Sequence, residues 1–87
     1  MTASIEQVRA GIMTATDKAS GALGALQQAY ADLEETLGML MHVTEGSPHA
    51  DVSQATGLLK QAMDDTQTAQ QATSAGIQQA EAVAARL

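Results

Sequence analysis

The chain has no cysteine, tryptophan or phenylalanine, and only one tyrosine and one proline among its 87 residues. The absence of cysteine excludes a disulfide scaffold, a thiolate zinc site and a cysteine nucleophile. Basic residues are also scarce: four stand against ten acidic ones, for a formal charge of −6. Because nucleic acids and anionic membranes are bound through basic patches, this balance argues against both as partners.

Long apolar runs are missing as well, so we expect no membrane span. The first residues, 1–13, contain no basic start followed by an apolar run, and we therefore expect no cleavable signal peptide. The compartment stays unknown from these observations. A cytoplasmic location is favoured, and export without a signal peptide is the alternative.

Two long helices are predicted from the remaining composition, which is rich in the helix formers Ala, Gln, Leu, Met and Glu. Ser4 and Gln7 have the spacing of a capping box, which predicts a helix start at residue 4. The one strong break follows Glu45. There Gly46 is suited to end a helix, while Ser47 and Pro48 have the order of an N-cap and a first helical residue.

We therefore predict one all-α domain over 1–87, with helices at about 4–45 and 48–86 and a turn at 46–47. No segment shows the alternation or the hairpin dipeptides of strands.

Apolar and small residues recur at every seventh position of both helices, which predicts an antiparallel, coiled-coil-like hairpin with an Ala-rich seam. In the first helix the two predicted core columns are Ile5, Ile12, Ala19, Leu26, Leu33, Leu40 and Val8, Ala15, Ala22, Ala29, Thr36, Val43. In the second they are Val52, Leu59, Thr66, Thr73, Ala80, Leu87 and Ala55, Ala62, Ala69, Gly76, Val83. The larger residues expected in this seam are Ile12, Leu26, Leu33, Leu40, Val52, Leu59 and Val83.

When the chain is folded back at Ser47, residues of one column fall opposite residues of another, and a large residue usually meets a small one. The pairs Ala15/Ala80 and Ala19/Gly76 illustrate this register in the small-residue middle of the hairpin.

A further apolar set does not fit the predicted seam. It comprises Leu23, Tyr30, Leu37, Met13, Met41, Leu58 and Met63. Large exposed apolar surfaces usually mark sites of association. We therefore expect these residues to form an interface with a second hairpin, which completes a four-helix bundle.

Metal and catalytic sites have weaker support. His42 and His49 flank the predicted turn, but their spacing matches no common ligand pattern, and solvated loop histidines are far more common. Acidic residues form a belt near the middle of the hairpin, mostly at outward positions: Asp32, Glu34, Glu35, Asp64 and Asp65. Metal binding by the histidines or by the belt stays an open alternative. We predict no catalytic residue, no cofactor and no small-molecule substrate.

The size, two-helix layout and acidic, cysteine-free composition resemble the small helical-hairpin proteins of type VII secretion, the WXG-motif family. Where that family has Trp-x-Gly, this chain has Glu45-Gly46-Ser47-Pro48, and its Tyr-x-x-x-Asp/Glu match, Tyr30 to Glu34, lies inside the first helix. No site residue is carried over. The resemblance implies a dimer of hairpins that acts as an exported protein or a targeting partner.

The leading functional hypothesis is therefore a non-enzymatic protein–protein interaction module that associates with itself as a homodimer or larger bundle. The alternative is a secretion-linked hairpin that pairs with a different helical protein.

Overall fold

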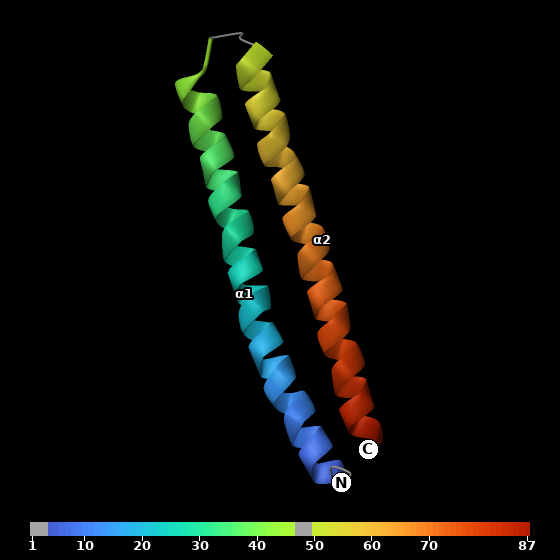
Figure 1. The fold of residues 1–87 in the computed structure, drawn as a ribbon. Helices are drawn as coiled ribbons and strands as arrows, with labels where there is room; N and C mark the ends of the chain where they lie inside the picture. Colours follow the sequence, from blue (N-terminus) through green and yellow to red (C-terminus); the bar gives the residue numbers. More distant parts are fainter. Residues whose placement is uncertain (1–3, 47–49) are drawn as a thin grey trace.

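The structure is a computed structural model, and it describes residues 4–46 and 50–87. Helix α1 spans Ile5–Val43 and helix α2 spans Ala50–Arg86, and the described residues contain no strand. The two helices run side by side in opposite directions, with the turn at one end and both termini at the other (Figure 1). The predicted all-α antiparallel hairpin is thus confirmed.

A capping box begins α1, as its sequence predicts. The backbone N–H of Gln7 donates to the Ser4 hydroxyl oxygen at 3.1 Å, and the backbone N–H of Ser4 donates to the Gln7 side-chain oxygen at 3.0 Å. Ser4 itself is extended, with φ −69° and ψ 158°. These bonds satisfy two backbone donors that would otherwise lack a partner at the helix start.

At its other end α1 stops at Val43, slightly before the predicted boundary at residue 45. Both the backbone N–H and the hydroxyl of Thr44 donate to the Leu40 carbonyl, at 3.1 and 2.7 Å. Gly46 then adopts a φ of +78°, a left-handed conformation that glycine reaches at little cost. The predicted cap at Ser47 and Pro48 lies outside the described residues.

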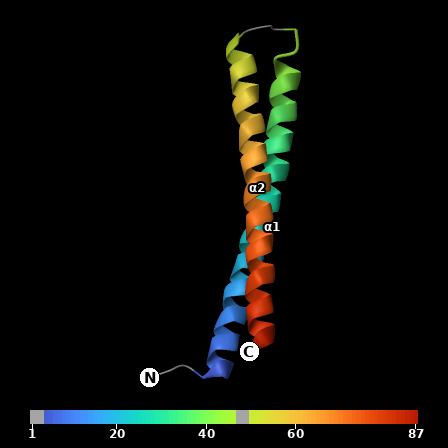
Figure 2. The ribbon, with the colours of Figure 1, turned by 90° about the vertical axis from the view of Figure 1, so that its right-hand side faces the viewer.

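The hairpin is long and thin, with extents of 66 × 21 × 15 Å. Its radius of gyration is 19.6 Å, whereas a compact domain of this length would have about 12 Å. Figure 2 shows the two helices crossing at a shallow angle, the geometry in which long helices keep a continuous line of contact. No residue in the described part of the chain is buried. The side chains between the helices are therefore half-buried at most.

Candidate functional site

The seam between the helices is marked by half-buried residues that recur at alternating spacings of four and three. In α1 this series is Ile12, Thr16, Ala19, Leu23, Leu26, Tyr30, Leu33, Leu37, Leu40 and Thr44. In α2 it is Val52, Thr56, Leu59, Met63, Thr66, Gln70, Thr73, Ile77, Ala80 and Ala84. Five residues beside these lines are also half-buried: Ala29, Ala55, Ala62, Ala69 and Ser74. Such a pattern follows one line along each helix, as expected where two helices wind around each other.

This series corrects the predicted seam. The sequence analysis places Leu23, Tyr30 and Leu37 outside it, but in the structure they are half-buried at seam spacing. Because α2 is the other described element, we infer that it is α2 that covers them. Of the residues predicted in their place, Ala22 and Thr36 are exposed, whereas Ala29 is half-buried. The physical reason is that larger side chains bury more apolar area, and each Å² removed from water contributes about 25 cal/mol.

On α2 the predicted companion column is displaced only in part. Met63 and Ile77 are half-buried and Gly76 is exposed, but Ala55, Ala62 and Ala69 are half-buried, as the sequence predicts. Val83, which the sequence analysis also assigns to the seam, is 37% exposed. The other predicted seam residues are half-buried: Ile12, Leu26, Leu33, Leu40, Val52 and Leu59. One column of each helix thus lies where the spacing predicts. The predicted companion column shares its place with the neighbouring column of larger residues.

Two side surfaces flank the seam, one on each side of the hairpin, because equivalent flanking positions of antiparallel helices lie on the same side. We call the first the small-residue face. It comprises Val8, Ala15, Ala22, Ala29, Thr36 and Val43 of α1 and Ala55, Ala62, Ala69, Gly76 and Val83 of α2. We call the second the polar face. It comprises Glu6, Met13, Ser20, Gln27, Glu34 and Met41 of α1 and Ser53, Lys60, Gln67, Ser74 and Glu81 of α2.

These two faces differ in chemistry. The small-residue face has no charged residue, whereas the polar face has three glutamates and one lysine. The sequence analysis finds the columns of the small-residue face but treats them as part of the seam. The signal that separates them is side-chain size, because each helix has three apolar columns and its two larger ones face the other helix.

Large exposed side chains extend the apolar surface near the turn. Met39, Val43 and Leu58 are 63%, 75% and 66% exposed. Two further methionines of the predicted interface, Met13 and Met41, are exposed on the polar face. Contact of these residues with a second hairpin stays a prediction.

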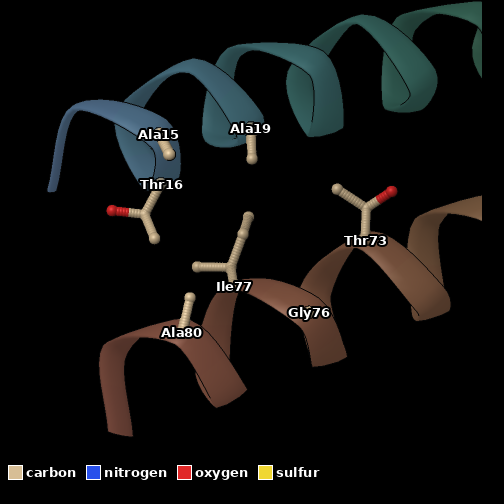
Figure 3. A pocket seen from close by; sticks show the side chains of 7 residues that line it. All are labelled: Ala15, Thr16, Ala19, Thr73, Gly76, Ile77 and Ala80. Atoms are coloured by element: carbon tan, nitrogen blue, oxygen red, sulfur yellow. The ribbon is translucent and has the colours of Figure 1, made fainter. Parts of the chain in front are cut away.

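A hollow of about 260 Å³ opens between the helices toward the end that holds the termini (Figure 3). It is lined by Ala15, Thr16 and Ala19 of α1 and by Thr73, Gly76, Ile77 and Ala80 of α2. The predicted opposite pairs Ala15/Ala80 and Ala19/Gly76 meet in this lining. No charged group borders the hollow. It exists because small side chains of both helices face each other there.

Threonines in the seam have partners on their own helix. The hydroxyls of Thr66 and Thr73 donate to the carbonyls of Ala62 and Ala69, each at 2.7 Å. Outside the seam Thr36 donates to the Asp32 carbonyl at the same distance. Such bonds let a hydroxyl lie between helices without a partner on the opposite helix.

Candidate metal ligands do not gather at one place in the described part of the chain. No group of three or more His, Cys, Asp or Glu residues that could hold a metal ion occurs among them. Near the turn, His42 Nδ1 lies 3.8 Å from Glu45 Oε2, with both side chains largely exposed, and His49 lies outside the described residues. In the acidic belt, Asp32 accepts a hydrogen bond from the Gln28 amide at 2.9 Å.

No family model, curated protein or solved structure matches this chain. Within the described residues, neither helix has the length and apolar character needed to cross a membrane. The candidate site is a surface and not an enclosed pocket. It consists of the small-residue face and the seam residues next to it.

Proposed function

We propose that this chain is a non-enzymatic protein–protein interaction module whose hairpin associates with a second copy of itself into a four-helix bundle. The observation that carries the proposal is the absence of any buried side chain among residues 4–46 and 50–87. Burial of apolar surface is the main favourable term in folding, and net stability is only a small surplus over the entropy cost. A second hairpin supplies the missing burial.

The exposed area gives the scale of what a partner can cover. The chain exposes 6363 Å², whereas a compact protein of 8.9 kDa exposes about 4,800 Å². The excess of about 1,600 Å² is about twice the roughly 800 Å² that each partner contributes to a standard interface. Covering part of this excess is enough for a stable homodimer.

The test is molar mass by light scattering across a dilution series, with helicity by far-UV circular dichroism on the same samples. We expect a mass of twice 8.9 kDa with high helicity, and a loss of helicity as dilution dissociates the assembly. Small-angle scattering should give a longest dimension near the 66 Å of one hairpin, because the copies lie side by side.

Two outcomes contradict the proposal. A well-folded monomer at micromolar concentration would show that the hairpin needs no partner. A poorly helical monomer would show that the second hairpin belongs to a different protein.

A further inference from the structure

We infer that the second copy packs against the small-residue face, so that the two hairpins meet through this same face on each. The inference rests on the proposed self-association and names the surface that performs it. The polar face then lies toward solvent in the assembled bundle.

The width of the apolar stripe supports this choice. A helix in a two-stranded coiled coil needs only two apolar columns of seven, whereas a helix in a bundle has three. Here the seam uses two columns of each helix, and the small-residue face is the third. Four of its eleven members, Ala29, Ala55, Ala62 and Ala69, are already half-buried beside the seam, and the other seven are exposed. The polar face provides no such column, because its apolar members, Met13 and Met41, alternate with polar and acidic residues.

The absence of charge on the small-residue face allows a second copy to be the occupant. Each chain has a formal charge of −6, so two copies repel each other unless their carboxylates lie outside the contact. The small-residue face is free of charge, whereas contact through the polar face would bring Glu6, Glu34 and Glu81 of both copies together against a single Lys60 each.

The face is also large enough. Along a hairpin of 66 Å, a strip about 12 Å wide provides the roughly 800 Å² per partner of a standard interface. The widths of the hairpin, 21 and 15 Å, exceed that value. Alanine and glycine in the middle of the face allow the helix axes to approach closely, while Val8, Val43 and Val83 provide larger side chains toward its ends.

The first test uses the absence of cysteine, because any introduced thiol is then unique. Ala22→Cys lies on the small-residue face and Gln27→Cys on the polar face, and both positions are exposed in the single hairpin. We expect a maleimide to react with Cys at position 22 at least tenfold more slowly than at position 27 in the assembled state. The difference should vanish at dilutions where the mass falls to that of one chain.

The second test adds two negative charges to each face. Ala22→Glu with Gly76→Glu changes two positions that are exposed in the single hairpin, and the Cβ added at Gly76 meets no atom within 4 Å. The matched control, Gln27→Glu with Gln67→Glu, has the same net charge on the polar face. We expect at least a tenfold weaker association for the first pair and a much smaller change for the control.

The outcomes separate the two claims. A wild-type protein that stays at 8.9 kDa at all concentrations contradicts the proposed function itself. A dimer in which position 27 is protected instead of position 22, or in which the control pair dissociates and the first pair does not, contradicts the assigned face and leaves self-association standing.

Discussion

Single residues limit the stability of each helix in this molecule. Glycines lie inside both helices, and at all the helical ones an added Cβ would meet nothing within 4 Å. These glycines are therefore not explained by packing within the hairpin, although each weakens its helix relative to alanine. The cost matters more than usual here because no described side chain is buried to offset it.

We expect Gly21→Ala to stabilise the hairpin by roughly 0.5–1 kcal/mol, because alanine loses less backbone entropy in a helix and meets no clash at this position. Gly46→Ala is the control. Its φ of +78° is unfavourable for alanine, so the same change should destabilise by about 1–2 kcal/mol. Urea unfolding followed by far-UV circular dichroism measures both. A loss of stability in Gly21→Ala would indicate that another helix approaches α1 there.

At the scale of elements, side-chain size decides which columns form the seam. Leu23, Tyr30 and Leu37 give α1 a continuous line of large residues beside the Ile12 to Leu40 column, and both lines are half-buried. The Ile12 to Leu40 column is interrupted by the small side chain of Ala19, where the hollow between the helices opens. The seam is thus packed loosely around residues 15–19 and 73–80, which line the hollow.

Ala19→Leu should therefore stabilise the hairpin by about 1 kcal/mol, because a leucine continues the seam column and fills part of the hollow. The matched control is Ala22→Leu, which makes the same change on the small-residue face. It should leave the hairpin unchanged but weaken association by overpacking the contact between copies. Thermal unfolding at two protein concentrations distinguishes the effects, and destabilisation by Ala19→Leu would contradict the seam described here.

Much of the fold could be predicted from the sequence because its signals are local. The capping box at Ser4 and the glycine at position 46 predict the start of α1 and the turn that follows it, and the seven-residue period predicts the antiparallel pair. The companion column could not be predicted as readily. Both candidate columns are apolar with the same period, and only the competition for the larger buried area favours Leu23, which is half-buried, over Ala22, which is exposed. Period alone does not distinguish these columns.

On the scale of the whole molecule, shape and charge act against each other. The elongated hairpin exposes far more surface than a compact fold of its mass, which favours association. The formal charge of −6 opposes it, because every added copy brings further carboxylates close together. Contact through the small-residue face avoids this repulsion at the interface, because it removes apolar area from water without bringing like charges together.

Salt should therefore strengthen self-association. Raising the ionic strength from about 10 mM to about 150 mM shortens the Debye length from about 30 Å to about 8 Å, which screens the repulsion between two acidic copies. Because the proposed contact contains no ion pair to be weakened, we expect the dissociation constant to fall several-fold, as measured by sedimentation or light scattering. Gln27→Glu with Gln67→Glu should show a steeper salt dependence, since it adds two negative charges outside the contact. Weaker association at higher salt would instead indicate that ion pairs hold the copies together, and it would contradict an uncharged interface.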